Sequence, residues 1–354
     1  MSVIVRFLWR DITLFRFPNA KILIFVIINK VLLRLGYVMR LRFSWLAMLL
    51  MLALTKVSAQ YDVHFTHYWA MDNFYNPAAM NKNNQLNLVA SYSMQMAGYE
   101  HRPSTMYVGA NSYMPWGQGR QSAGAGFLNE TIGLFTHRRI FANYAYKLKV
   151  GGGWMNVGAQ VGLLNEEFDG GGLDVIDAND PAFPTSAEKG TGLDLGAGVY
   201  YNYKIFYAGL SAQHITSPVI TYGKGGGKGA ELRVLPAFYF QSGCNIQLRN
   251  PLLSIQPTVQ AATDLGTLRV DITLRGTYQY QSNSYYAGIS YSPGTSVTIL
   301  LGGRVKKVLV GYAYELFTNG IGWQTGSHDL VVGYQMDVDF FKKGKNVHKS
   351  VRYL

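Results

Sequence analysis

Apolar and polar residues alternate along much of the chain, as residues 268–280, LRVDITLRGTYQY, illustrate. Every second residue from Leu268 to Tyr280 is apolar, aromatic or glycine, and the residues between them are polar or charged. Because the side chains of a strand alternate between its two faces, this segment predicts a strand with one apolar and one polar face. Strands of soluble sandwiches usually have about five or six residues, whereas a tilted strand needs roughly nine to eleven to cross a bilayer. The length of the segment therefore favours a membrane-spanning strand.

The same alternation recurs along the chain and predicts fourteen strands. The predicted strands are 86–97, 104–114, 120–132, 136–149, 153–164, 191–203, 206–215, 232–248, 251–264, 267–281, 284–292, 296–303, 305–316 and 327–340. Connections after even-numbered strands are all short, and those after odd-numbered strands include the long ones, at 165–190, 216–231 and 317–326. This asymmetry is typical of an outer-membrane barrel. We predict an all-β fold, a closed antiparallel transmembrane β-barrel of about 14 strands over residues 86–341, with twelve strands as the alternative count.

In such a barrel the apolar face of each strand contacts lipid and the polar face lines the lumen. We therefore expect Arg269, Asp271 and Arg275 to face the lumen, because charges on the lipid side near the bilayer midplane are costly. Closure of the sheet pairs every backbone amide of the ladder, which an open sheet in hydrocarbon could not do.

Composition agrees with a glycine-rich, aromatic-rich barrel. The 354 residues include 39 Gly, aromatic residues make up 14%, and charged residues make up only 15%. A soluble domain usually has about 25% charged residues, so an average cytosolic enzyme is disfavoured, as is a disordered chain. The single cysteine, Cys244, excludes a disulfide-dense secreted fold.

The N-terminal residues predict an export signal, which is set aside before the fold is considered. Residues 39–59, MRLRFSWLAMLLMLALTKVSA, combine a positive start, an apolar stretch and a small-residue cleavage site before Gln60. The apolar run is shorter than the ~20 residues that a membrane anchor needs, so we expect cleavage and export to the outer membrane. Residues 1–38 are interpreted as an upstream extension, with Met39 as the true initiator.

Removal of the leader changes the charge of the chain. Residues 1–59 hold nine Lys or Arg and one acid, so the net charge falls from +12 for the whole chain to +4 for the exported part. The high isoelectric point therefore belongs mostly to the leader, and no nucleic-acid partner is expected.

Residues 60–85 precede the first predicted strand and lack its alternation. They are rich in aromatic residues, including Trp69 and Phe74, around a turn at Asn76 and Pro77. Two interpretations stay open, a plug or hatch that enters the lumen and an ordered lead-in to the barrel.

Candidate chemistry elsewhere is weak. Asp62, His64 and His67 lack a third histidine ligand for a zinc site, and Ser211 and His214, three apart on a strand, point to opposite faces. The acidic segment 165–189 does not have the spacing of an EF-hand, and YGKGGGKGAE lacks the first glycine and the hydroxyl of a phosphate-binding loop. No catalytic residue, metal or cofactor is predicted.

The last residues form a basic tail, 342–354. Because an even number of strands puts both termini of the barrel on the same side of the membrane, we expect this tail to lie in the periplasm. Two interpretations stay open, docking of an acidic partner by charge and a merely soluble, disordered tail. The candidate docking residues are Lys342, Lys343, Lys345, Lys349 and Arg352.

An ordered series of short segments resembles the PorP/SprF family, outer-membrane components of the type IX secretion system of Bacteroidetes, which also serves gliding. The segments are NPAA, SAGAGFLNETIG, NYAYKLKV, MNVGAQVGL, FYAGLSAQH, YYAGISYSP, VLVGYAYEL and GSHDLVVGYQM. The resemblance covers nearly all of residues 60–341. One departure is Asp329, where the family often has Glu.

This resemblance implies a barrel similar to the fatty-acid-transporter type, without catalytic residues. Its implied partners are the type IX translocon, periplasmic secretion components and cargo with a C-terminal sorting domain, in contact with outer-membrane lipid. We predict a monomeric, non-enzymatic secretion component that docks cargo or links the translocon to periplasmic machinery. The alternatives are a transporter for small hydrophobic molecules and, more distantly, a barrel lipase.

Overall fold

The computed structural model describes residues 62–80, 85–114, 120–169, 187–221, 231–318 and 325–337. The chain divides into two units, Met1–Val57 and Ser58–Leu354, and all of the described residues belong to the second. The predicted leader and the upstream extension therefore lie outside the described residues. None of the helices in the described ranges is long and apolar enough to cross a membrane.

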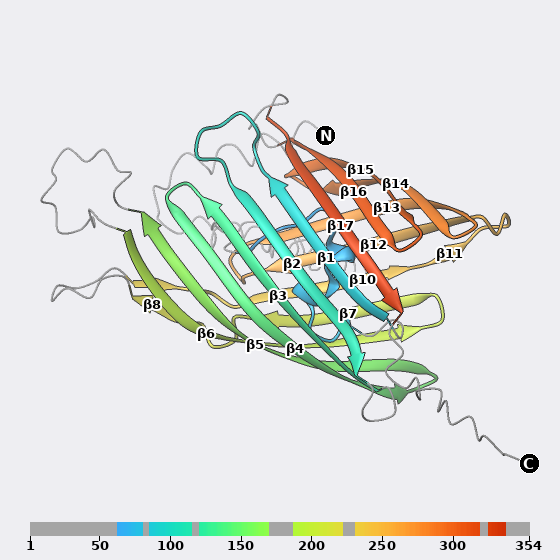
Figure 1. Cartoon of the computed structure of the whole chain (residues 1–354), viewed down its shortest axis with the longest axis horizontal. Coiled ribbons are helices and arrows are strands. Elements are labelled where there is room, and N and C mark those ends of the chain that lie inside the picture. Colours follow the sequence, from blue (N-terminus) through green and yellow to red (C-terminus); the bar gives the residue numbers. More distant parts are fainter. Residues whose placement is uncertain are drawn as a thin grey trace, which may run out of the picture. The chain divides into compact units, whose positions relative to one another are not determined.

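The second unit is a closed antiparallel β-barrel (Figure 1). Fifteen of its described strands form one sheet, which closes because β1 pairs with β17 and β10 pairs with β7 and β12. Both β10 and β11 pair with β12, and β11 follows β10 directly in the chain, so the two count as one strand of the wall. The wall therefore has 14 strands. The strands are β1 (Gln85–Met94), β2 (Ser104–Met114), β3 (Gln121–Ile132), β4 (Phe135–Val150), β5 (Gly153–Asp169), β6 (Ala187–Tyr203), β7 (Phe206–Gln213), β8 (Val219–Thr221), β9 (Glu231–Arg233), β10 (Ala237–Cys244), β11 (Ile246–Gln247), β12 (Leu253–Thr263), β13 (Leu268–Tyr280), β14 (Asn283–Ser292), β15 (Ser296–Val305), β16 (Val308–Phe317) and β17 (Ser327–Asp337).

The prediction of a closed barrel of about fourteen strands is confirmed. The predicted bounds of two segments, 232–248 and 165–190, were wrong. The predicted strand 232–248 is divided, because β9 leaves the wall to pair with β8 and the wall strand begins only at Ala237. Pro236, which lacks a backbone N–H to donate to a ladder, stands at this division. The predicted loop 165–190 is shorter, because β5 and β6 continue to pair as far as Asp169 and Ala187.

The two faces of the wall differ as the alternation requires. On β13 the side chains of Leu268, Ile272 and Leu274 are 68%, 49% and 56% exposed, whereas Asp271 and Thr273 are only 3% and 1% exposed. A wide belt of exposed apolar side chains on the outer surface would aggregate in water and suits contact with hydrocarbon.

The connections distinguish the two ends of the barrel. At one end, here called the short-turn end, the hairpins between β4 and β5, β6 and β7, β13 and β14, and β15 and β16 are two-residue turns. Gly151 and Gly152 both have positive φ angles, 55° and 80°, as the tight turn between β4 and β5 requires. The first residue of β1, Gln85, pairs with the last of β17, Asp337, so the described barrel begins and ends at the short-turn end.

Candidate functional site: the barrel interior and its N-terminal segment

Residues 62–80, here called the N-terminal segment, run through the interior of the barrel (Figure 1, blue). The segment has little regular structure, a turn of 3₁₀-helix η1 (Tyr68–Ala70) and a short helix α4 (Asp72–Tyr75). The helix ends before Asn76, whose φ and ψ of −140° and 114° are extended. Proline disfavours helical geometry in the residue before it, so Pro77 explains why the helix stops there.

Aromatic side chains of the segment pack against aromatic side chains of the wall. Phe74 is completely buried, and its ring centroid lies 5.4 Å from Phe65 and 5.3 Å from Tyr107 of β2. Tyr75 lies 5.2 Å from Tyr239 of β10. These edge-to-face contacts bury the apolar side of the segment in an interior that is otherwise largely polar.

Amide side chains of the wall satisfy the backbone carbonyls of the segment. Gln213 donates to the carbonyl oxygens of Phe74 and Tyr75, at 2.5 and 2.9 Å, and Asn143 donates to the carbonyl of Asn73 at 2.6 Å. Asn156 donates to the carbonyls of Ala78 and Met80 at 2.9 and 3.1 Å. Because a buried chain without secondary structure cannot satisfy its own carbonyls, these wall residues hold the segment in one conformation.

Asn76 bonds to two neighbouring strands at once. Its Nδ2 donates to the carbonyl oxygens of Val199 on β6 and Leu210 on β7, at 3.1 and 3.2 Å. A Cβ on Gly198 would lie only 2.2 Å from Asn76 Oδ1, so the wall needs glycine at this close approach.

The opposite side of the barrel binds residues 64–68 of the segment. Asp329 on β17 accepts hydrogen bonds from the backbone N–H and the hydroxyl of Thr66, at 3.0 and 2.6 Å. His64 lies 3.2 Å from Asp271 on β13, and the hydroxyl of Tyr68 lies 2.6 Å from that of Thr258 on β12. In the 14-strand ring β17 and β7 face each other, so the segment bridges the interior.

The structure places Arg269, Asp271 and Arg275, the predicted lumen residues, on the inner face of β13. Arg269 forms ion pairs with Asp271 at 3.2 Å and with Glu315 of β16 at 2.9 Å. The guanidinium of Arg275 lies over the indole of Trp69, 3.9 Å from the ring centroid.

The predicted plug residues all lie in the barrel interior. Phe74, Asn76 and Pro77 are buried, and Trp69 is half-buried. The basic tail residues Lys342, Lys343, Lys345, Lys349 and Arg352 lie outside the described residues, as do residues 222–230 of the glycine-lysine segment.

Sequence reasoning missed a cluster of buried charges that lies toward the end of the barrel opposite to the short-turn end. Asp62 accepts a hydrogen bond from the hydroxyl of Tyr239, and His214 lies between Asp62 and Asp194, at 3.7 and 3.1 Å. Arg139 pairs with Asp194 at 2.8 Å. Burial raises the pKa of the Asp62 carboxyl, but hydrogen bonding and charge from His214, with the charge of Arg139, outweigh burial and hold this pKa below its usual range. The signal available in sequence was two charges, Arg139 and Asp194, on the polar faces of predicted strands.

The residues considered for catalysis or metal binding have separate structural partners. Ser211 donates its hydroxyl hydrogen to the carbonyl oxygen of Tyr75 at 2.7 Å. The rings of His67 and Trp69 are tilted at 57° to each other, with their centroids 5.2 Å apart. Among the described residues, no group of three or more His, Cys, Asp or Glu is placed to hold a metal ion.

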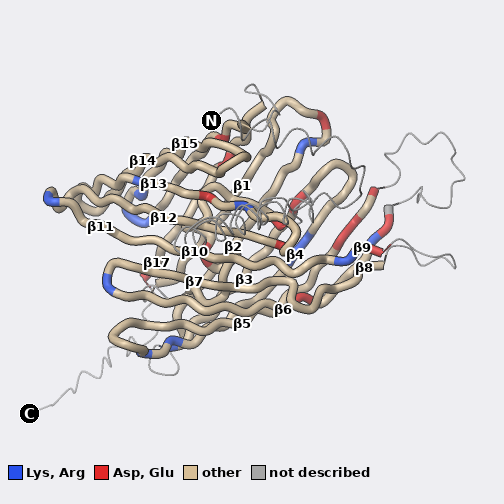
Figure 2. The backbone as a smooth tube through the Cα atoms, turned by 180° about the vertical axis from the view of Figure 1, so that it is seen from behind, with Lys and Arg blue, Asp and Glu red and all other residues tan. Residues whose placement is uncertain are grey.

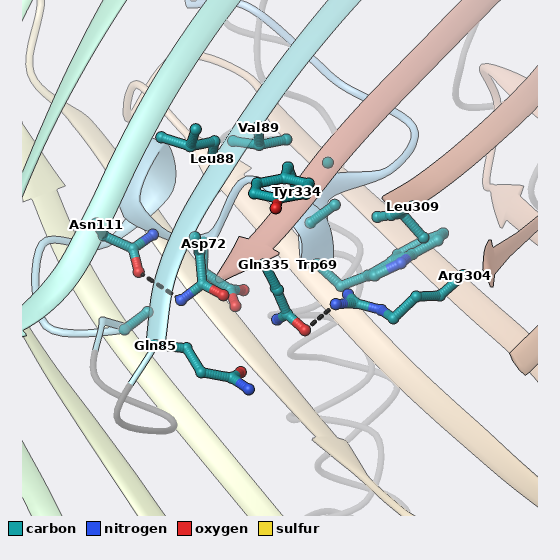
Figure 3. A pocket seen from close by; sticks show the side chains of 14 residues that line it. Trp69, Asp72, Gln85, Leu88, Val89, Asn111, Arg304, Leu309, Tyr334 and Gln335 are labelled. Carbon is teal, nitrogen blue, oxygen red and sulfur yellow. Dashed lines mark hydrogen bonds between the residues drawn. The ribbon is translucent and has the colours of Figure 1, made fainter. Parts of the chain in front are cut away.

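A cavity of about 210 Å³, lined by both polar and apolar side chains, lies at the short-turn end between the N-terminal segment and the wall (Figure 3). Trp69 and Asp72 line it from the segment, and Asn87, Arg304 and Gln335 line it from β1, β15 and β17. Arg304 donates a hydrogen bond to Gln335, and Asn87 donates one to Asn111 at 3.1 Å (Figure 3).

Together, a closed 14-strand wall, an apolar outer belt and a polar interior that holds the chain's own N-terminal segment define a membrane β-barrel. Residues 57–334 match the family described as type IX secretion system membrane protein PorP/SprF. The chain belongs to this family, and the resemblance seen in the sequence is confirmed.

Several solved structures are similar to this chain at low sequence identity. The toluene transporter TodX of Pseudomonas putida matches with a TM-score of 0.45 and 10% identity, over 81% of this chain and 97% of TodX. The toluene transporter TbuX of Ralstonia pickettii matches with a TM-score of 0.44 and 11% identity, over 74% and 92% of the two chains. A Pseudomonas aeruginosa FadL homologue matches with a TM-score of 0.43 and 10% identity, over 74% and 92%. No curated protein sequence matches the chain.

Proposed function

We propose that this chain is a non-enzymatic outer-membrane component of the type IX secretion system that docks other proteins and does not itself conduct cargo. The observation that carries the proposal is the bridging N-terminal segment. Thr66 is bonded to Asp329 on one side of the ring and Phe74 and Tyr75 are bonded to Gln213 on the other. Such a segment occupies interior space that a polypeptide would need, which leaves the turns, loops and tail as surfaces for partners.

The proposed orientation places the short-turn end in the periplasm. Short periplasmic turns and longer extracellular loops are usual in outer-membrane barrels, and β1 begins and β17 ends at the short-turn end. The predicted basic tail would then extend toward periplasmic machinery, and the loops would face cargo that carries a C-terminal sorting domain.

A strain that lacks the gene tests the proposal. We expect cargo with a C-terminal sorting domain to accumulate in the periplasm and the tagged barrel, when restored, to co-purify with secretion components. Normal secretion without the gene would contradict the proposal.

An uptake assay with liposomes distinguishes the proposed function from the alternative, which is transport of small hydrophobic molecules. We expect liposomes that contain the purified barrel to retain a small dye and to take up no more toluene than empty liposomes. Rapid uptake by the intact barrel would favour transport, with the N-terminal segment as its hatch.

The lipase alternative has no support in the position of Ser211. Its hydroxyl already donates to the carbonyl of Tyr75 inside the barrel, beneath the N-terminal segment. A serine nucleophile needs a base within hydrogen-bond reach, whereas His214 lies between Asp62 and Asp194.

A further inference from the structure

Two hollows at the short-turn end adjoin each other and are together called the recess here; polar and apolar side chains line both. The outer hollow, here called the rim groove, measures about 560 Å³ and is lined by the turns after β13 and β15 and by the paired ends of β1 and β17. The inner hollow is the 210 Å³ cavity of Figure 3. The two share Gln85 and Gln335, so the rim groove leads inward to Arg304.

Positive charge predominates around this recess. Its lining includes three cations, Arg304, Lys306 and Lys307, all from the hairpin between β15 and β16. It also includes two acids, Asp72 in the inner cavity and Asp337 in the rim groove, where Asp337 lies 3.6 Å from Lys307. Further cations at the described short-turn end are Arg120, Lys147, Lys149, Lys204 and Arg249. Figure 2 shows Lys and Arg at these turns, with Asp and Glu gathered toward the other end. A recess of this sign attracts an acidic ligand and raises its rate of association.

The recess also contains hydrogen-bonding groups suited to a peptide backbone. Amide side chains of Gln85, Gln281, Asn283 and Gln335 line it, and each can both donate and accept. In the inner cavity Asn87 Oδ1 is buried without a hydrogen-bond partner in the described part of the chain. A buried acceptor of this kind is costly unless a ligand or water donates to it.

Arg304 is the anchor of the inner cavity. Within the described residues its guanidinium makes one hydrogen bond, to Gln335, although the group carries five N–H donors in a planar fork. The fork geometry matches a carboxylate, which can accept two parallel hydrogen bonds.

We propose that the rim groove and the cavity behind it bind an extended acidic peptide segment of a periplasmic partner protein, with a carboxylate on Arg304. The partner's location rests on the proposed function, which places the short-turn end in the periplasm. Arg304 and Gln335 project from the inner face of the wall, so an anionic lipid headgroup beside the apolar outer belt fits less well. The chain's own tail fits less well because Lys342, Lys343 and Lys345 carry the same sign as the recess.

The test measures binding of a fluorescent twelve-residue peptide rich in Asp and Glu to the full exported chain in detergent, against a peptide with Asn and Gln in their place. We expect the acidic probe to bind more tightly and the doubly substituted Arg304→Gln, Lys307→Gln chain to bind it about tenfold more weakly. Lys147→Gln with Lys149→Gln, which removes the same charge from the hairpin between β4 and β5, should change binding by about twofold or less. Asp337→Asn should tighten binding about two- to threefold, because it removes a competing carboxylate.

Heat-modifiable migration on a gel checks that each variant still forms a barrel. Equal binding of the two probes would overturn the proposal, as would equal weakening in both double variants. Competition by nanodiscs of phosphatidylglycerol, but not of phosphatidylcholine, would overturn it in favour of a lipid site.

The outcomes for the recess and for the proposed function are distinguishable. If the barrel co-purifies with secretion components while the recess variants bind the acidic probe like the parent chain, the recess proposal alone is overturned. If the acidic probe binds as expected but secretion is normal without the gene, the proposed function is overturned and the recess remains a binding site.

Discussion

The guanidinium of Arg275 lies 3.9 Å from the centre of the Trp69 indole ring, which joins the wall to the N-terminal segment. One residue is a predicted lumen charge on β13 and the other a predicted plug residue more than 200 positions earlier in the chain. A cation over an indole face is attracted by the negative ring, and the attraction is greater when both groups are shielded from water.

This contact predicts that Trp69→Ala lowers the free energy of unfolding by about 2 kcal/mol, through lost packing and lost cation–π attraction. Thermal unfolding of the barrel in detergent, followed by near-ultraviolet circular dichroism, measures the loss. The matched control is Trp154→Ala, which removes an exposed indole with Lys147 Nζ 4.9 Å from its ring centroid and should cost under about 1 kcal/mol. Equal losses would show that the interior contact has no special weight.

Gly198→Ala tests the close approach of Asn76 to the wall. The added Cβ would lie 2.2 Å from Asn76 Oδ1, so the segment must shift, and we expect a loss of about 1–3 kcal/mol with faster proteolysis of residues 62–80. Gly276→Ala is the control, because nothing lies within 4 Å of a Cβ on that strand glycine. If residues 62–80 of the Gly198→Ala variant stay protected from proteolysis, the close contact between Asn76 and Gly198 does not fix the position of the segment.

On the outward face of β13, the cost in folding free energy of a charged substitution should depend on its depth in the membrane. Leu274, 56% exposed near the middle of the strand, should cost about 2–4 kcal/mol when changed to Arg, because a charge there meets hydrocarbon. Leu268→Arg, at the end of the same strand, should cost only about 0–1 kcal/mol. Folding of the two variants into lipid vesicles, titrated with denaturant, gives both values. The reverse order would mean that the strand does not span the bilayer as described.

His67 predicts a loss of stability in acid. Burial, and then the positive charge of Arg275, lowers the pKa of His67 from 6.5 to about 3. Between these two values the unfolded chain binds a proton that the folded chain does not, so stability is present above pH 6.5 and decreases as the pH falls toward 3. The slope from this one group approaches about 1.4 kcal/mol per pH unit.

His67→Gln, which cannot titrate, isolates this contribution. Unfolding free energies of both proteins at pH 7, 5.5 and 4 should diverge, with the shallower decrease in the variant. Parallel curves would mean that His67 is accessible to protons in the folded barrel.

The strands of the wall could be predicted from the alternation of apolar and polar residues, because this alternation arises within each strand. Residues one apart point to opposite faces of a strand, so contact of one face with lipid and of the other with the interior appears in the sequence as alternation, as on β13. Pattern was insufficient where pairing continued through polar residues, since Glu166 lies opposite Gly190 in a region predicted as loop. At Pro236 the loss of one backbone donor divided a segment whose alternation continued across it.

The contacts between the N-terminal segment and the wall, by contrast, depend on the tertiary structure. The sequence by itself predicted a closed barrel with an alternating inward and outward face and about 14 strands, with twelve as the alternative, and it showed that residues 60–85 lack the alternation of a strand. It did not determine that Thr66 meets Asp329 or that Asn76 meets Gly198, since these pairs join positions far apart in the chain through a segment with almost no regular structure. Such a segment has no periodicity of its own, and its conformation follows from the carbonyls, aromatic rings and charges that the closed wall presents to it.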